Sequence, residues 1–467
     1  MFLSSIEGDV KVEQTGSVTR VSLGIKIGYA LGLYGIAIAQ TGFTVLLVYC
    51  YTDVFGLTPG QAGTIIFVGS FIDIAVNLLI PSLTAATKTR LGRYRPYVIF
   101  GSIFFGAAFG AMFIRPDLPP AQLFVYALCI HLAYRFTYGF ILTPHSSLIS
   151  RMTSDADERA SIGSVKTIGS NLGVLCSAYV GLGLVAWLGN GNDRVGFTYF
   201  GLVFGFLVFL SVCLSGIASK ERDVNDAVMD QETGSILPAL SLIGRNTQLL
   251  FALAATAFYF AAYLVLNSAI LYYFKYVREA SDAAKMALLA VSLGGIVMPL
   301  FWTPIVRRTS KAAVWAIGCA LICVASLSLW LFSEATLALI LVAYVVAGMG
   351  KSAIQMNYFA ITADAVDYGH WRHGRRAEAY SFGLLSIMTK VGYGMGGAIV
   401  GLALTWSGFV ANSVQTPETI ERLRIMAGLL PALLVTISGL LVLGFRVNAR
   451  KHREIVSDLQ ARANGGG

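Results

Sequence analysis

Charged residues are scarce in this chain of 467 residues. Only 13% of the residues are Asp, Glu, Lys or Arg, and 56% are hydrophobic, whereas a soluble domain carries roughly 25% charged residues. A soluble protein of this composition would need an unusually large core, so the composition favours a membrane protein. The net charge of +9 does not indicate nucleic-acid binding, because the cations are scattered among apolar segments and form no single basic face.

Motifs that carry catalytic or metal chemistry are also missing from the sequence. The six cysteines lie in apolar segments without a CxxC pair, which argues against a zinc site or a disulfide framework. There is no HExxH, no GxxxxGK[ST] and no GxSxG in a strand–turn–helix setting. We therefore expect no enzyme, no catalytic residues, no metal site and no cofactor.

Long apolar stretches are abundant, and a helix needs about 20 such residues to cross a bilayer. Twelve candidates fall near 24–52, 60–86, 96–114, 121–149, 161–187, 195–218, 247–275, 284–305, 313–332, 337–362, 378–406 and 422–446. The polar segment 219–246 separates the sixth candidate from the seventh. We therefore expect an all-α protein of two six-helix halves, 24–218 and 247–446, with tails at 1–23 and 447–467.

Loop charges indicate the orientation of these helices. The stretch TKTRLGRYRP, residues 87–96, carries Lys88, Arg90, Arg93 and Arg95 between two apolar segments. Short cytoplasmic loops collect Lys and Arg, and alternate loops of this chain are richer in them. The first twenty residues are polar and lack the apolar core of a signal peptide. We therefore expect both termini in the cytoplasm.

The two halves resemble each other weakly. The second candidate helix is followed by TKTR and the eighth by RRTSK, while Lys166 in the fifth corresponds to Lys390 in the eleventh. Such internal symmetry is typical of transporters, which bind their substrates between the repeats near the middle of the membrane.

A few polar side chains fall deep within the predicted helices. Arg135, Lys166 and Lys390 would each cost roughly 2.5–3.5 kcal/mol at a helix centre, so each should face a partner, water or a ligand. In HLAYRFTYGFILTPHSSL, the stripe His131, Arg135, Tyr138, Leu142 and His145 lies on one helix face. That stripe should face a cavity, although a hydrogen-bonded helix contact is the alternative. Gln40 and Gln355 add uncharged polar groups.

Asp73 is the deep acid of the first half, and Asn77 lies one turn further on the same face. Asp73 could pair with Arg135, bind a proton or bind a metal cation. The sequence leaves these three alternatives open.

Three motifs together resemble one transporter family. They are YCYTDVFGL at 49–57, IDIAVNLLIPSLTAATKTRLGRYRP at 72–96 and ITADAVDYGHWRHGRRAEAYS at 361–381. The chain is similar to the glycoside-pentoside-hexuronide:cation symporters of the major facilitator superfamily, which include the sodium-coupled melibiose permease. The resemblance implies a twelve-helix, alternating-access sugar transporter with a cation site on the second and fourth helices.

The residues matched to that family depart from its pattern. Asp73 matches the first aspartate of the family's cation site, but Asn77 and Leu142 stand where two further aspartates are expected, and Ala37 replaces a sugar-binding aspartate. Lys and Arg favour carboxylates, sulfates or phosphates. The shift from acidic to basic groups therefore predicts an anionic sugar-like substrate, such as a hexuronide or an acidic glycoside.

The predicted sites follow from these comparisons. The substrate site comprises Gln40, Arg135, Tyr138, His145, Lys166, Gln355 and Lys390. The cation site comprises Asp73 and Asn77, and we expect it to couple to a proton rather than to sodium, because countercharge has been lost. A gate of ion pairs between the cytoplasmic ends of the halves is expected from Arg151, Asp155, Glu158, Asp364, Asp367, Arg375 and Arg376.

Other interpretations remain open on the sequence alone. They are an uncoupled facilitator, a carrier of a non-sugar anion or of a lysolipid, and a membrane sensor that transports nothing. We expect a monomer in the inner membrane of a bacterium, with the lipid bilayer and a small acidic substrate as its partners and no nucleic acid.

Overall fold

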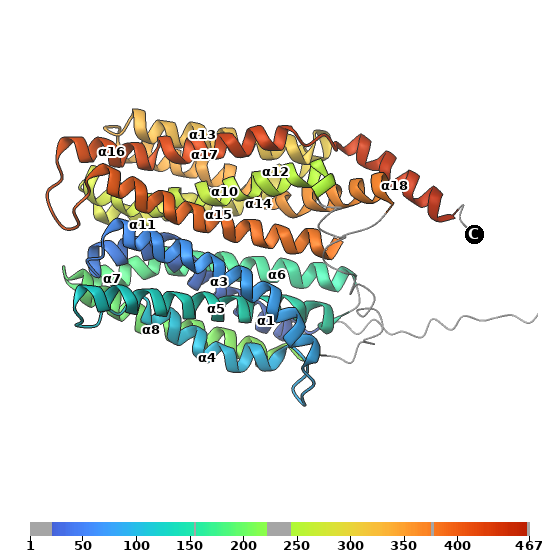
Figure 1. The fold of residues 1–467 in the computed structure, drawn as a ribbon, viewed down its shortest axis with the longest axis horizontal. Helices are drawn as coiled ribbons and strands as arrows, with labels where there is room; N and C mark the ends of the chain where they lie inside the picture. Colours follow the sequence, from blue (N-terminus) through green and yellow to red (C-terminus); the bar gives the residue numbers. More distant parts are fainter. Residues whose placement is uncertain (1–20, 154–155, 222–243, 375–377, 465–467) are drawn as a thin grey trace, which may run out of the picture.

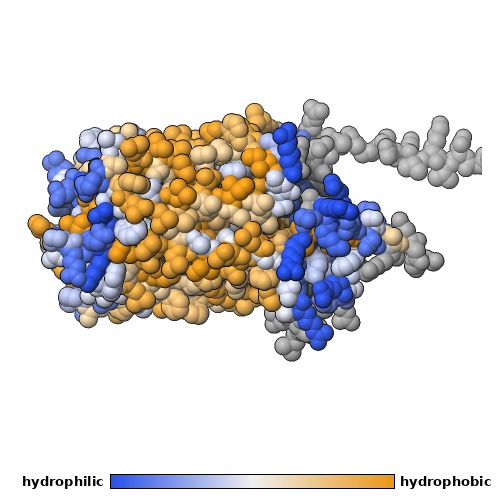
Figure 2. Space-filling model, turned by 90° about the horizontal axis from the view of Figure 1, so that it is seen from above, coloured by the Kyte–Doolittle hydropathy of each residue, from blue (hydrophilic) through white to orange (hydrophobic). Residues whose placement is uncertain are grey.

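The computed structural model describes the chain except for residues 1–20, 154–155, 222–243, 375–377 and 465–467. The described residues form helices that run along the long axis of the molecule and gather into two bundles (Figure 1). Apolar side chains form a broad band around the middle, and hydrophilic side chains lie at both ends (Figure 2). This distribution is the one that a protein spanning a bilayer requires.

The first bundle follows the chain from α1 to α8. Its elements are α1 (Leu23–Thr41), η1 (Gly42–Leu46), α2 (Leu47–Tyr49), η2 (Cys50–Val54), α3 (Pro59–Ala86), α4 (Arg95–Ala111), α5 (Pro120–Met152), α6 (Ala156–Leu175), η3 (Cys176–Val180), α7 (Gly181–Gly189) and α8 (Asp193–Ala218). The π-helical turns η1 and η3 join helical pieces into continuous rods, and the π-helical turn η2 ends the first of these rods at Val54.

The second bundle follows from α10 to α17. Its elements are α10 (Thr247–Tyr272), η6 (Tyr273–Val277), η7 (Ser281–Ala283), α11 (Ala284–Val297), α12 (Pro299–Arg308), α13 (Lys311–Leu331), α14 (Leu337–His373), α15 (Glu378–Ser407), α16 (Pro417–Ala427) and α17 (Leu429–Leu443). Helix α18 (Ala449–Asn464) extends from the bundle at the end that carries the C-terminus (Figure 1).

Among the described residues, ten helices are long and apolar enough to cross a membrane. The pair α11 and α12, bent by 41°, makes an eleventh if it is one span, and α4 is a shorter apolar helix of 17 residues. The expected all-helical fold is therefore confirmed. The predicted count of twelve spans is supported only as far as ten or eleven.

Local signals account for where the helices begin. Thr58 caps α3 through a reciprocal pair of hydrogen bonds with Gln61, and Pro59 occupies the first turn, where its missing N–H costs nothing. One sequence expectation needs correction: the segment expected to be a loop after residue 362 is helical as far as His373. The predicted tail contains α18, a helix that the sequence analysis did not predict.

The two bundles approach each other closely where α3 lies beside α15. A Cβ atom added at Gly63 would lie 2.9 Å from the Gly401 Cα, and one added at Gly401 would lie 2.8 Å from the Pro59 carbonyl oxygen. Only glycine permits this spacing of helix backbones. The contact is therefore set by small residues on both helices.

Candidate functional site

A buried ion pair lies within the first bundle. Asp73 of α3 accepts a hydrogen bond from Arg135 Nη2 of α5, and the two side chains are 0% and 1% exposed. Gly69 makes the approach of α5 feasible, because a Cβ there would lie 2.5 Å from His131 Nε2 and 3.2 Å from the Arg135 Cγ. Of the alternatives for Asp73 left open by the sequence, the structure shows the pair with Arg135.

Two cations share one aromatic ring beside this pair. The Arg135 guanidinium lies 4.4 Å from the Phe43 ring centroid and 5.7 Å from that of Tyr138. The Lys390 ammonium of α15 lies 5.0 Å from the Tyr138 ring. Since α15 belongs to the second bundle, the Tyr138 ring contacts cations from both bundles, and its negative face lowers the cost of placing them together.

Several polar atoms at this position have no partner among the described residues. They are Asp73 Oδ1, Asn77 Nδ2, Arg135 Nε and Nη1, both ring nitrogens of His131, and Gln40 Oε1. Buried polar groups are normally hydrogen-bonded, and an orphaned group needs an explanation. Within a membrane such groups mark substrate and ion pathways. The cluster can therefore accept a ligand that brings its own hydrogen-bonding groups.

His145 lies apart from this cluster, although it shares the predicted stripe of α5. Its ring stacks on Tyr29 of α1 with centroids 4.6 Å apart, and its Nε2 lies 2.9 Å from the Ser215 hydroxyl of α8. Among the described contacts, His145 therefore forms a helix–helix junction inside the first bundle, the alternative that the sequence left open. The expectation that the whole stripe faces one cavity does not extend to this residue.

The remaining predicted substrate residues lie on different helices. Lys166 of α6 is half-buried, and Gln355 of α14 is exposed. Gln40 lies near the end of α1, where the helix passes into η1.

Sequence reasoning missed the aromatic side chains that line the boundary between the bundles. Phe43 of η1 contacts Tyr393 of α15 at 5.9 Å between ring centroids, and Tyr393 contacts Phe260 of α10 at 5.1 Å. Aromatic residues are common in any membrane helix, so their composition gave no signal; only the packing of α1, α10 and α15 brings them together.

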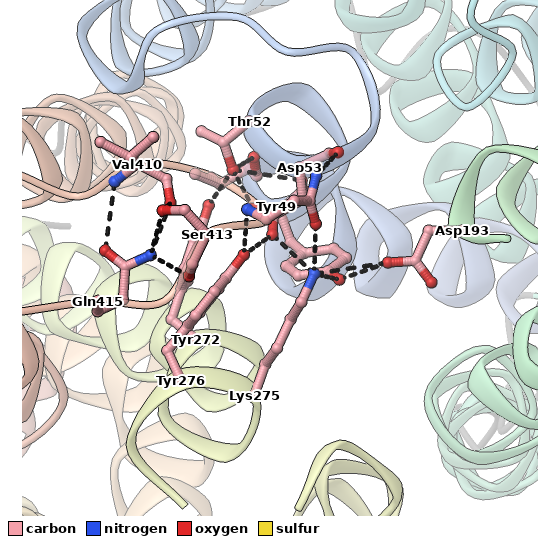
Figure 3. Close-up of polar contacts among 12 residues, drawn as sticks. Tyr49, Thr52, Asp53, Asp193, Tyr272, Lys275, Tyr276, Val410, Ser413 and Gln415 are labelled. Carbon is pink, nitrogen blue, oxygen red and sulfur yellow. Dashed lines mark hydrogen bonds and ion pairs between the residues drawn. The ribbon is translucent and has the colours of Figure 1, made fainter. Parts of the chain in front are cut away.

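A polar network joins the bundles at one end of the molecule (Figure 3). The Lys275 ammonium lies 2.9 Å from Asp53 Oδ1, 2.6 Å from the Tyr49 hydroxyl and 2.9 Å from Asn412 Oδ1. Asp193 at the start of α8 is 3.6 Å from the same ammonium. We call these residues the outer network, because Lys275 ends the seventh candidate helix at the end opposite to the predicted cytoplasmic one. They are Tyr49, Thr52, Asp53, Asp193, Tyr272, Lys275, Tyr276 and Asn412.

Further bonds make this contact tight. The Tyr276 hydroxyl donates to the Asp53 carboxylate and accepts from the Asn412 backbone N–H at 2.9 Å, while Asn412 Nδ2 donates to the Asp53 carbonyl at 2.7 Å. A hydrogen bond of 2.7 Å joins the hydroxyl groups of Thr52 and Tyr272. Asn412 holds a φ of +56° in this turn, a conformation that asparagine tolerates better than most residues. Between the bundles, the second thus supplies the donors Lys275, Tyr276 and Asn412, and the acceptors belong to Tyr49 and Asp53 of the first.

Two of the predicted gate residues, at the end opposite to the outer network, form ion pairs within their own bundles. Glu158 Oε2 lies 2.9 Å from the Lys26 ammonium, and both residues belong to the first bundle. Asp364 Oδ1 lies 2.7 Å from the Lys311 ammonium in the second bundle. Among the ion pairs whose two residues are both described, those that join the two bundles are formed by Lys275 in the outer network.

The other predicted gate residues are spread over the same end. Arg151 lines a basic pocket beside the α3–α4 loop, and Asp367 Oδ2 lies 3.1 Å from His452 Nε2 of α18. Three further gate residues lie outside the described residues, namely Asp155, Arg375 and Arg376. Pairing between the bundles at this end therefore stays a prediction.

With this geometry established, comparison with known proteins identifies the family. The model of the family described as MFS/sugar transport protein matches residues 28–449. This chain belongs to that family. It is accordingly a membrane transporter and not an enzyme, and its relatives are consistent with the glycoside-pentoside-hexuronide branch of the major facilitator superfamily.

Similar proteins include bacterial sugar transporters. The chain is 28% identical over 422 residues to a putative glycoside/cation symporter of Escherichia coli (strain K12), covering 89% of this chain and 90% of that one. It is 26% identical over 444 residues to a glucuronide carrier protein homolog of the same strain, covering 93% and 95%. A solved bacterial homologue of the human drug peptide transporters PepT1 and PepT2 shares the fold, with a TM-score of 0.65, 10% identity and 90% and 97% coverage.

Proposed function

We propose that this protein carries an anionic sugar-like substrate, such as a hexuronide or an acidic glycoside, by proton-coupled symport with alternating access. The observation that carries the proposal is the Arg135 side chain, which pairs with Asp73 through one nitrogen while its Nε and Nη1 have no partner among the described residues. A guanidinium with two unpartnered N–H groups is suited to binding a carboxylate.

Lys390 supports the choice of an anion. It approaches the same Tyr138 ring from the second bundle, so a substrate anion between the two cations would touch both bundles at once. Such a position is the one expected of a transporter site at the boundary between repeats. The similarity to a glucuronide carrier protein homolog adds support, because a glucuronide bears a carboxylate.

Coupling follows from competition for Arg135. A substrate carboxylate that binds Arg135 Nε and Nη1 would draw on the single positive charge that now balances Asp73, which has no exposed surface through which water could solvate it. A buried carboxylate without a partner is costly, and taking up a proton removes its charge. Substrate and proton therefore bind together, Asp73 being the proton carrier.

Sodium fits this site less well. Sodium requires several oxygen ligands and negative countercharge, and the charge of Asp73 is already balanced by Arg135. Asn77, one turn along α3, supplies no charge. A proton needs only one carboxylate oxygen and no coordination shell.

Alternating access assigns a role to the outer network. In the state described by this structure it fastens the two bundles at the predicted outer end, so the substrate would exchange with the cytoplasm. The opposite state would form when the outer network opens and the cytoplasmic ends of the bundles pair. The candidates for that pairing are Arg151, Asp155, Glu158, Asp364, Asp367, Arg375 and Arg376.

The topology we propose has twelve spans, in two halves at 24–218 and 247–446, with both termini in the cytoplasm. It counts α11 and α12 as one bent span and α4 as a short one, because 17 residues of helix extend about 25 Å and 17 residues is the lower limit for a span. We place the protein as a monomer in the inner membrane of a bacterium.

The test uses the purified chain in liposomes. Uptake of a labelled glucuronide and of its neutral glucoside is followed in sodium-free buffer, with and without an inward proton gradient. We expect gradient-driven accumulation of the glucuronide and little uptake of the glucoside. Uptake of the glucoside alone would overturn the anionic substrate, and accumulation that requires sodium would overturn proton coupling.

Variants separate the roles within the site. Asp73→Asn should abolish gradient-driven accumulation while sparing exchange of substrate across the membrane. The neutral pair Asp73→Asn/Arg135→Gln removes both charges without leaving one buried, and should lose glucuronide binding as well. Unchanged uphill transport by Asp73→Asn, or normal glucuronide affinity in the double variant, would refute the assigned roles.

A further inference from the structure

A basic pocket and an apolar groove adjoin each other on the surface of the first bundle. The groove, of about 1110 Å³, runs between α4 and α5, and the pocket, of about 750 Å³, lies beside the loop that joins α3 to α4. Thr87 lines both, and its hydroxyl lies 2.5 Å from that of Tyr97, which lines the groove. This region is separate from the Asp73–Arg135 site, and of its residues only Arg151, a candidate for the cytoplasmic gate, has a role in the proposed transport mechanism.

The groove is suited to a hydrocarbon chain. Its walls are almost entirely apolar, and three of its aromatic rings remain well exposed: Phe100 at 57%, Phe104 at 66% and Phe136 at 46%. These rings belong to the apolar helices α4 and α5, where the surrounding solvent is lipid. An acyl chain that enters the groove therefore exchanges contacts with bulk lipid for contacts with fixed rings.

The pocket is suited to an anionic group. It is lined by five cations, Lys88, Arg90, Arg93, Arg95 and Arg151, and by one carboxylate, that of Glu221. The carboxylate is engaged elsewhere, because its two oxygens accept the backbone N–H groups of residues 93, 94 and 95 at 2.7–2.9 Å. The charge of the pocket is therefore strongly positive.

Two of these cations are available to a ligand. Lys88 and Arg90 are exposed, and neither makes an ion pair with any residue that the structure describes. The turn that presents them is fixed by Gly92, whose φ of +104° few other residues adopt, and by a hydrogen bond of 2.7 Å from the Thr89 hydroxyl to the Gly92 carbonyl. Their position is therefore built into the loop.

We propose that this pocket and groove together form a binding site for an anionic phospholipid. The phosphate and its glycerol group lie against Lys88 and Arg90, and one acyl chain follows the groove past Thr87. Basic pockets between membrane helices bind anionic headgroups in this way. A free phosphate would use the pocket but not the groove, so continuity of the two favours a lipid.

The site also has the correct position along the molecule. The loop between α3 and α4 lies at the same end as α18 and the C-terminus (Figure 1), the end that we predict to face the cytoplasm. Anionic lipids attract basic residues just outside the hydrocarbon region. Here Lys88 and Arg90 lie directly beyond the end of α3 and follow Thr87, which lines the groove.

The experiment is native mass spectrometry of the purified full chain in detergent, with added phosphatidylglycerol or phosphatidylethanolamine. We expect the wild type to retain one phosphatidylglycerol in preference to phosphatidylethanolamine. Each basic residue near a membrane surface contributes about a five-fold factor in affinity. The variant Lys88→Gln/Arg90→Gln should therefore bind phosphatidylglycerol roughly thirty-fold more weakly.

Two further variants keep the result specific. Arg308→Gln/Arg453→Gln makes the same change of charge on exposed residues outside the pocket and should bind phosphatidylglycerol like the wild type. Ala133→Phe places a ring in the groove, where Ala133 is exposed, and should also displace the lipid. Millimolar glycerol phosphate should not compete.

Several outcomes would overturn the proposal. Equal retention of both lipids, or wild-type affinity in Lys88→Gln/Arg90→Gln, would show that the pocket does not select an anionic headgroup. Normal lipid binding by Ala133→Phe together with competition by glycerol phosphate would indicate a site for a soluble phosphate. Wild-type dimers that are lost in Ala133→Phe would indicate that a second copy of the chain, and not a lipid, occupies the groove.

Discussion

Removing Lys275 should open the outer end of the molecule. The Lys275 side chain is 22% exposed, and its partner Asp53 has a fully buried carboxylate. The substitution Lys275→Met keeps the apolar stem and deletes three contacts of 2.6–2.9 Å. Two of these partners, Tyr49 and Asp53, belong to the first bundle, so their contacts with Lys275 exist only while the outer ends are together.

The size of the effect follows from burial. Truncating one partner of a buried, hydrogen-bonded ion pair costs about 2–5 kcal/mol, much of it from the charge left behind. Water still reaches part of Lys275, so we expect the lower half of this range, about 2–3 kcal/mol. Such a change moves the equilibrium towards the state with separated outer ends by roughly 30- to 150-fold.

The assay measures distances between spin labels at the predicted outer end. Labels at Asp117 and Glu334, both exposed and in different bundles, should report a short distance in the wild type and an added longer distance in Lys275→Met. The control Lys285→Met makes the same substitution at the same end, where the ammonium lies 3.9 Å from an exposed Asp282. It should leave the distances unchanged.

A double variant tests the cause. Asp53→Asn/Lys275→Met removes the uncompensated charge as well as the ammonium, so it should shift the distances less than Lys275→Met does. If Lys275→Met gives the wild-type distance distribution, or if the double variant opens further than the single one, the outer network does not hold the bundles together in the way described.

Three further predictions concern packing and substrate choice. Gly401→Val should greatly reduce transport, because the new side chain would meet the backbone of α3. Gly183→Val should transport normally, because a Cβ atom at Gly183 has no neighbouring atom within 4 Å. The measurement is the initial rate of uptake at equal expression. His145→Ala should destabilise the fold by about 2–4 kcal/mol and lower the apparent Tm. It should not change the preference for acidic over neutral substrates. An altered preference at normal stability would contradict the packing role of His145. Lys390→Gln should raise the KM for a glucuronide at least five-fold more than the KM for a glucoside, and Lys285→Gln should change neither; equal effects on both substrates would exclude Lys390 as an anion-binding group.

The sequence by itself determined where most of the apolar helices lie. It did not predict two helical segments of the second half, the last part of α14 and the helix α18. Apolar runs of about 20 residues can satisfy their backbone groups in lipid only as helices, so span positions are local properties. The polar stretch after residue 362 lacked that signal, and its helicity as far as His373 was missed. Helix α18 was missed for the same reason.

The sequence also limited the partners of Asp73. Arg135 was among its expected partners because an acid and a base this deep in a membrane are stable when they neutralise each other, and the structure shows the pair. The helical spacing of α5 did not reveal which residues face the other bundle. Tyr138 lies beside Lys390, whereas His145 packs on Tyr29.

Tertiary structure alone decided the outer network. Its residues lie at positions 49–53, 193, 272–276 and 412, and in the sequence Lys275 is only a cation at the end of the seventh candidate helix. Partners separated by up to 359 residues leave no local pattern, because no helical or loop period connects them. Their meeting depends on how two bundles pack, and that is the property on which alternation between states depends.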